Sequence, residues 1–159
     1  MAVNSDITID EAITTLSVAD KEIVRELYEN AVAIGYMPVI GRAGKTEGNY
    51  KLEFKKDKNS YVLFILRISK GQLSIGSKLL HMGKYCDLID NLSDTVRNEL
   101  LESRVCNVDG GCTAFINFKY NNKKYYICRH AIRLKKVTPS DTSALWKMLE
   151  AEVACRESA

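Results

Sequence analysis

Residues 50–75, YKLEFKKDKNSYVLFILRISKGQLSI, constrain the fold of this chain more than any other segment. Apolar and charged residues alternate from Tyr50 to Lys55, which is typical of a strand with one buried face. Tyr61 to Ile68 is apolar at seven of eight positions and predicts a central strand covered on both faces. Lys70-Gly71 supplies a tight turn into a third strand, Gln72 to Ile75. Because such short connections exclude parallel crossovers, the segment predicts an antiparallel meander.

A second hairpin is predicted for residues 113–130, in which two apolar-rich segments flank Asn121-Asn122. Asparagine tolerates the positive φ angles that a two-residue turn requires. This turn fixes the register, and Phe118, Ile116, Tyr125 and Ile127 then make the buried face of the hairpin. The expected pairs are Tyr120 with Lys123, Phe118 with Tyr125, Ile116 with Ile127, and Ala114 with Arg129.

Capping signals and helical periodicity predict helices before, between and after these hairpins. Ser17 is spaced as the N-cap of a helix that Gly35 ends, and Ser93 as the cap of a helix reaching Ser103. Thr138-Pro139-Ser140-Asp141 opens a terminal helix, whose apolar stripe includes Leu145, Met148, Leu149 and Val153. A short helix is also expected over Asp10–Leu16.

The predicted fold is a single α+β domain over residues 1–159, with two layers. Its antiparallel sheet has five or six strands, built from the meander 50–75 and the hairpin 113–130. The N-terminal and C-terminal helices pack mainly on one face of that sheet. Residues 35–49, which are rich in glycine, are expected to form a loop over one edge.

Composition fits a globular protein, with 46% apolar and 27% charged residues and only two prolines. No apolar run approaches the roughly 20 residues of a membrane span, and the first residues are acidic where a signal peptide is basic and then apolar. Five irregularly spaced cysteines fit a reducing compartment better than a disulfide framework. We therefore expect a cytoplasmic protein.

The net charge of +3 conceals a segregation of charge along the chain. Residues 35–80 carry 9 basic and 3 acidic groups, and residues 119–137 carry 7 basic groups and no acidic group. The predicted helical segments hold most of the acidic residues. If helices cover one face of the sheet, the molecule has a basic side and an acidic side.

Cysteines near the second hairpin suggest a metal site. Cys106, Cys112 and Cys128, with His130 beyond, resemble the ligands of structural zinc sites. The fourth ligand is left open among His130, His81, Asp109 and Cys86. Against zinc, the spacing of the first two cysteines exceeds the usual two to four residues, and the hairpin register points Cys112 away from Cys128. Ordinary reduced thiols are the alternative interpretation.

No complete catalytic set is present in the sequence. A Cys128-His130 pair on one strand is conceivable as a nucleophile and base, but no nucleophile elbow or oxyanion-hole motif accompanies it. Gly44-Lys45-Thr46 lacks the earlier glycine of a phosphate loop, and that position is Val39. The sequence therefore favours a non-enzymatic protein.

Three functional hypotheses remain. The first is a binding or regulatory module for a small anionic or aromatic ligand, or for a protein partner, using the open face of the sheet or residues Tyr36, Arg42, Lys45 and Tyr126. The second is a nucleic-acid-binding domain, and the third a zinc-stabilised interaction domain. The oligomeric state, monomer or homodimer, stays open. Nucleic acid would contact Lys119, Lys123, Lys124, Arg129, Arg133, Lys135 and Lys136.

Overall fold

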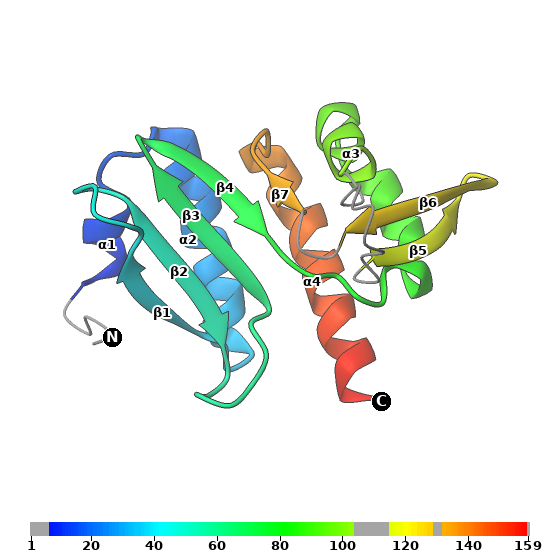
Figure 1. The fold of residues 1–159 in the computed structure, drawn as a ribbon, viewed down its shortest axis with the longest axis horizontal. Helices are drawn as coiled ribbons and strands as arrows, with labels where there is room; N and C mark the ends of the chain where they lie inside the picture. Colours follow the sequence, from blue (N-terminus) through cyan, green and yellow to red (C-terminus); the bar gives the residue numbers. More distant parts are fainter. Residues whose placement is uncertain (1–6, 104–114, 129–131, 159) are drawn as a thin grey trace.

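The fold is α+β, as the sequence predicts, and it contains a five-stranded antiparallel sheet and a separate two-stranded sheet. It is seen in a computed structural model that describes residues 7–103, 115–128 and 132–158. Figure 1 shows the larger sheet on one side of the molecule and the two-stranded sheet on the other. The terminal helix lies between them.

The larger sheet contains the predicted meander as three consecutive strands, β2 (Tyr50–Lys55), β3 (Phe64–Ser69) and β4 (Gln72–Gly76). The β3–β4 hairpin turns through Lys70 and Gly71, which have φ angles of 52° and 74°. Two successive positive φ angles are the geometry of the two-residue turns that match strand twist. The strand order is β1-β2-β3-β4-β7, where β1 is Met37–Arg42 and β7 is Arg133–Leu134.

Strand β1 corrects the prediction of a loop over residues 35–49. Met37–Arg42 pairs with β2 along its whole length, from Met37 opposite Lys55 to Arg42 opposite Tyr50. Pro38 and Gly41 weaken the strand signal in the sequence. They are tolerated because β1 is the edge strand, where a proline lacking an N–H group blocks further pairing.

The second hairpin has the predicted register but forms its own sheet. β5 (Phe115–Tyr120) and β6 (Lys123–Cys128) pair Phe118 with Tyr125 and Ile116 with Ile127. The expected pair of Ala114 with Arg129 lies outside the described residues. The expectation that this hairpin extends the meander sheet is wrong, because β7 takes the position beside β4. The hairpin instead packs on two short 3-10 helices, η1 (Met82–Lys84) and η2 (Cys86–Asn91).

The caps predicted at Ser17 and Ser93 begin two helices, whereas Thr138-Pro139-Ser140-Asp141 forms a 3-10 turn before the terminal α-helix, and the helix expected over Asp10–Leu16 ends at Ala12. α2 (Val18–Ala33) is capped by the hydroxyl of Ser17, which accepts from the amide N–H of Asp20 at 3.1 Å, and Gly35 follows its end with φ +88°. The remaining helices are α1 (Ile9–Ala12), α3 (Asp94–Leu101) with the Ser93 cap, η3 (Pro139–Asp141) and α4 (Thr142–Glu157).

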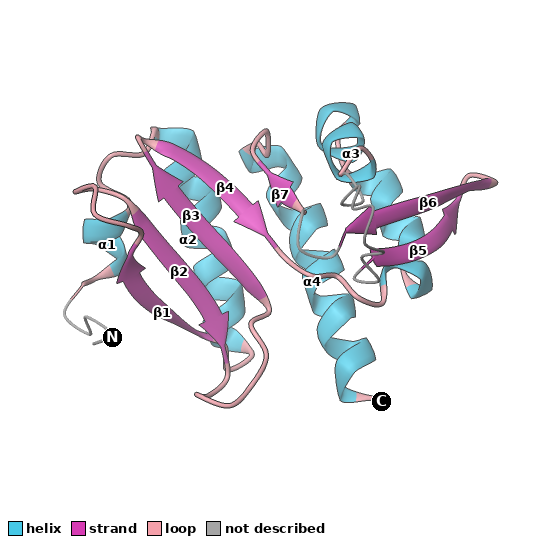
Figure 2. Ribbon diagram, in the orientation of Figure 1, coloured by secondary structure: helices cyan, strands magenta, loops and turns pink. Residues whose placement is uncertain are grey.

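The helices of the described residues cover one face of the five-stranded sheet, and Figure 2 shows α1 and α2 behind it. Phe54 and Phe64 stack on that covered face with ring centroids 4.3 Å apart, and Trp146 of α4 packs edge-on against Phe64. Leu52, Leu66 and other alternate strand residues are fully buried there. The intervening residues lie on the opposite, open face, which carries the candidate site.

No helix in the described ranges combines the length and the apolar character needed to cross a membrane.

Candidate anion-binding site

The open face of the five-stranded sheet is strongly basic. Strand alternation and the pairing register place side chains of β2, β3 and β7 on it, and Lys135 follows directly after β7. Glu53 is the acidic residue at an open-face position of the five strands, and its carboxylate lies 3.7 Å from Nζ of Lys51. The cationic residues of this face are Lys51, Lys55, Arg67, Arg133 and Lys135.

Arg67 is the centre of this surface. It lies in the middle strand of the sheet, directly opposite Lys51 on β2 and Ser74 on β4, and its side chain is partly buried. Within the described residues its guanidinium forms no hydrogen bond and no ion pair, and Lys51 opposite it is also cationic. Like charges directly opposite each other destabilise a sheet, so a bound anion would relieve this arrangement.

The pKa of Arg67 reflects its partial burial and the charges around it. Burial lowers the pKa of its guanidinium, and the nearby positive charge of Arg133 lowers it further, while Glu53 acts in the opposite direction. The charges of Arg67 and Arg133 therefore interact across β4. Two guanidinium groups with several N–H donors each suit an oxyanion that accepts hydrogen bonds from both.

Gly76 provides the space between these two arginines. It pairs with Ile65 on one side and Arg133 on the other, so a side chain at this position would stand on the open face. A Cβ atom there would lie 3.3 Å from Nη1 of Arg67 and 3.2 Å from the backbone oxygen of Ile132. A glycine inside a strand often marks such a close approach.

Two hollows adjoin Arg67. One has a volume of about 110 Å³, and its lining includes Val62, Ile65, Gly76 and Arg67. The other has a volume of about 450 Å³ and is lined by Arg67, Ser69, Gln72, Leu73, Ser74, Arg133 and Lys135. Because only Arg67 lines both, its side chain lies at the boundary between a smaller hollow, lined in part by Val62 and Ile65, and a larger cationic one.

A second polar cluster surrounds Glu152 of α4, which is fully buried. Its carboxylate accepts hydrogen bonds from the backbone N–H of His81 at 2.9 Å, from Tyr85 Oη at 2.7 Å and from Arg156 Nε at 2.7 Å. Nδ1 of His81 lies 2.9 Å from the other side of the carboxylate. Burial by itself would raise the pKa of Glu152, but these hydrogen bonds hold it below its ordinary value.

The polar groups of the Glu152 cluster have hydrogen-bond partners within the protein. Burial and the hydrogen bond to Glu152 raise the pKa of Tyr85, so that this phenol stays protonated as a donor. Among the described residues, no buried side-chain nitrogen or oxygen lacks a hydrogen-bond partner. The arrangement anchors α4 to the turns before β5, and it offers no unpaired group to a ligand in the way that Arg67 does.

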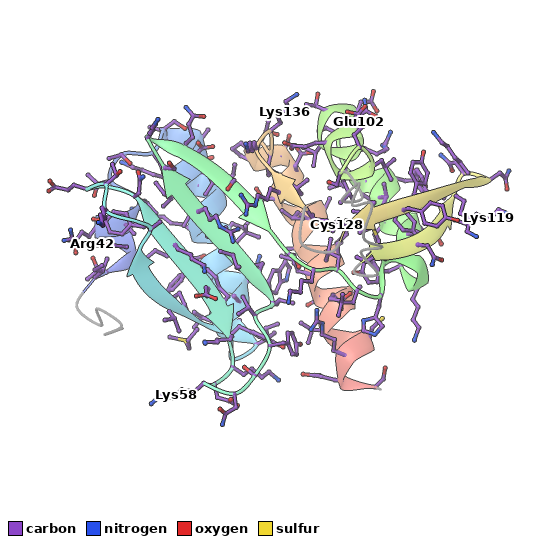
Figure 3. All side chains as sticks on the ribbon, in the orientation of Figure 1. Arg42, Lys58, Glu102, Lys119, Cys128 and Lys136 are labelled. Atoms are coloured by element: carbon purple, nitrogen blue, oxygen red, sulfur yellow. The ribbon has the colours of Figure 1, made fainter. Side chains whose placement is uncertain are left out.

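The four residues expected to bind a small ligand do not converge in the structure. Tyr36 is 1% exposed, and its hydroxyl is hydrogen-bonded to that of Tyr61. Arg42 and Lys45 are exposed at the end of β1 and in the turn after it, whereas Tyr126 is on β6. Figure 3 labels Arg42 at one end of the molecule and Lys119, on the β5–β6 hairpin, at the other.

The expected zinc ligands are mostly outside the described residues, which exclude Cys106, Cys112 and His130. Cys128 ends β6 and is buried. In the part of the chain that is described, no three His, Cys, Asp or Glu side chains are grouped as a metal site. Zinc binding therefore stays a prediction from the sequence.

The basic residues expected to contact nucleic acid divide between two surfaces. Lys119, Lys123 and Lys124 are exposed on the β5–β6 hairpin. Arg133, Lys135 and Lys136 lie at β7 and just after it, on the side of the larger sheet, and Arg129 is not among the described residues. Of these residues, Arg133 and Lys135 line the larger hollow together with Arg67.

Sequence reasoning missed Arg67 and Gly76. The available signals were a single charged residue within the apolar run 61–68 and a glycine directly after the third strand of the meander. Neither signal indicates that the two residues touch. Glu152 was also missed, although it follows Met148 by four residues and therefore continues the apolar stripe of the terminal helix.

Comparisons with protein-family models, with curated proteins and with solved structures found no match, so the geometry of the site alone supports a functional conclusion.

Proposed function

We propose that this protein is a non-enzymatic binding module that holds a small anionic ligand on the open face of its five-stranded sheet, between Arg67 and Arg133. One observation carries the proposal: Arg67 is partly buried opposite Lys51, and its guanidinium forms no ion pair among the described residues, although the charge of Glu53 on the neighbouring strand acts on its pKa. A partly buried charge is stabilised when an opposite charge contacts it. An oxyanion bound by both arginines would supply the missing charge.

The composition of the open face supports a small ligand over a nucleic-acid strand. Single-stranded nucleic acids are held by aromatic platforms as well as by cations. No aromatic side chain occupies an open-face position of the five described strands, whose apolar residues there are aliphatic, such as Val39 and Ile65. The cationic hollow of about 450 Å³ also has the size of a small-molecule site.

The test is an NMR titration of the isotopically labelled protein with inorganic phosphate and with acetate, at constant ionic strength. We expect saturable shifts of amide signals in β3, β4 and β7 in the wild type, and none in Arg67→Gln. The matched control is Arg42→Gln, because Arg42 is exposed at the end of β1 and lines neither hollow. It should bind as the wild type does.

Thermal unfolding separates loss of a ligand from loss of the fold. Arg67→Gln removes a repelling charge opposite Lys51, so we expect its stability to equal or exceed that of the wild type. Binding that survives in Arg67→Gln, or that disappears in Arg42→Gln alone, would overturn the proposed site.

The β5–β6 hairpin favours a second candidate function, binding of single-stranded nucleic acid. Nζ of Lys124 lies 5.6 Å from the ring centroid of Tyr126, which is 48% exposed, and Lys119 is opposite Lys124. An exposed aromatic ring flanked by cations is the usual stacking element. Fluorescence anisotropy with labelled oligonucleotides should show an affinity that falls steeply with salt and that is lost in Tyr126→Ala. Lys58→Ala, in the turn after β2, is the control.

A further inference from the structure

The small hollow beside Arg67 has a chemistry of its own. The side chains of Val62 and Ile65 contribute apolar surface to its volume of about 110 Å³, and Phe64 and Ile132 also line it. The hydroxyl of Ser77 also lines it, but that group already donates to the backbone oxygen of Leu63 at 2.7 Å. The apolar part of the lining is therefore the part formed by Val62 and Ile65, and the polar part includes Arg67 and Lys78.

The two hollows lie in sequence along the β3–β4 hairpin. Residues before Arg67 on β3 line the smaller hollow together with Gly76 at the end of β4. Residues after Arg67 line the cationic hollow together with residues at the start of β4. A single ligand can therefore place a charged group on one side of Arg67 and an uncharged group on the other.

We infer that the ligand is an amphipathic anion, with an oxyanion head between Arg67 and Arg133 and a short apolar tail in the hollow lined by Val62 and Ile65. This inference rests on the proposed anion-binding function and adds the class of ligand. The head is a carboxylate or a phosphate. An apolar protein cavity of about 150 Å³ accommodates benzene, so a hollow of about 110 Å³ fits a tail of about four or five carbons.

The experiment is a series of linear carboxylates from acetate to octanoate, measured by calorimetry or NMR at constant ionic strength. Each buried methylene should strengthen binding about fourfold, until the tail reaches about five carbons and the hollow is full. Longer chains should gain nothing more. A parallel series of alkyl phosphates distinguishes the two head groups. Affinity should rise with chain length in both series, and the ligands with the preferred head group should bind more tightly at every chain length.

A variant that fills the hollow provides the specific control. Ile65→Phe should still bind acetate and inorganic phosphate but should lose the gain with chain length, and Val62→Phe should do the same from a different wall. Two filling variants keep the test valid if one of them folds poorly. Val39→Phe adds the same volume on the same face, on β1 and away from both hollows, and it should retain the gain.

The outcomes separate this inference from the function on which it rests. If acetate and phosphate bind but affinity does not rise with chain length, the tail site is wrong and the anion site stands. If the gain persists in both Ile65→Phe and Val62→Phe, the tail lies elsewhere, and the inference is also wrong. If no anion binds at all, both proposals fail. Contacts between ligand alkyl protons and the Ile65 methyl groups, seen as intermolecular NOEs, would place the tail directly.

Discussion

The guanidinium of Arg156 lies over the aromatic ring of Tyr61, with its central carbon 4.0 Å from the ring centroid. Nε of the same guanidinium donates to the buried carboxylate of Glu152 at 2.7 Å. Arg156 is near the end of α4, and Tyr61 lies just before β3. This contact therefore joins the terminal helix to the sheet that carries the candidate site, and it makes the buried charge of Glu152 part of the structural support of the fold.

Glu152→Gln should destabilise the protein by about 3 kcal/mol, because it leaves Arg156 without a charged partner in a largely buried position. Chemical denaturation followed by circular dichroism would measure the free energy of unfolding. The control is Glu150→Gln, an exposed position on the same helix, where the change should stay within about 0.5 kcal/mol. Equal stabilities of the two variants would show that Glu152 carries no such role.

Stability should fall in acid because the pKa of Glu152 is lower in the folded protein than its ordinary value of 4.5. A group with a depressed folded pKa contributes stability above its unfolded pKa, and that contribution is lost as the pH falls through the folded pKa. We expect the loss to begin near pH 4.5 and to continue below it. The free energy of unfolding, measured from about pH 7 to about pH 2.5, would show this loss.

The same measurement on two variants identifies the group responsible. Glu152→Gln should reduce the acid slope, and Glu150→Gln should leave it as in the wild type. Asp141 is expected to add to the slope, since backbone N–H groups of Ser93 and Thr138 lower its pKa against the opposing effect of burial. An unchanged slope in Glu152→Gln would contradict the assignment to that carboxylate.

Gly76→Ala should weaken anion binding severalfold. The added methyl group would lie 3.3 Å from Nη1 of Arg67, so the guanidinium must shift, and the nearby backbone of Ile132 leaves little room for relaxation. We expect a stability loss of about 1 kcal/mol from this crowding. Gly41→Ala is the control, because a Cβ on this open-face glycine of β1 would meet nothing within 4 Å. Phosphate titration of both variants gives the comparison.

Asn122→Gly should raise the free energy of unfolding by about 0.5 kcal/mol, because Asn122 has a φ angle of 63° in the β5–β6 turn and glycine adopts that conformation without steric cost. Asn122→Ala should lower it by about 1 kcal/mol. Asn59 lies in a turn but does not have a positive φ angle, so Asn59→Gly should not stabilise the protein. Denaturation midpoints measure all three variants.

Local features of the fold could be predicted because their causes lie within a few residues. The Lys70-Gly71 and Asn121-Asn122 turns fix which residues face each other, and the structure has the predicted pairs Phe118–Tyr125 and Ile116–Ile127. The Ser17 and Ser93 caps also form with the backbone N–H groups three residues later. These turns and caps form between residues that are close in the sequence, so they do not depend on contacts with distant segments.

The meander, the register of the second hairpin and the caps of α2 and α3 follow from residues that are close in the sequence, since their hydrogen bonds and hydrophobic period act over short distances. Which strands share a sheet depends on how distant elements bury their apolar faces against each other. The pairing of Gly76 with Arg133 and the contact of His81 with Glu152, 71 residues away, are examples. The position of Arg67 between two hollows is a product of that assembly. Side-chain proximity across elements has no periodic signal in a single chain, and this is why the candidate site emerged from the structure and not from the sequence.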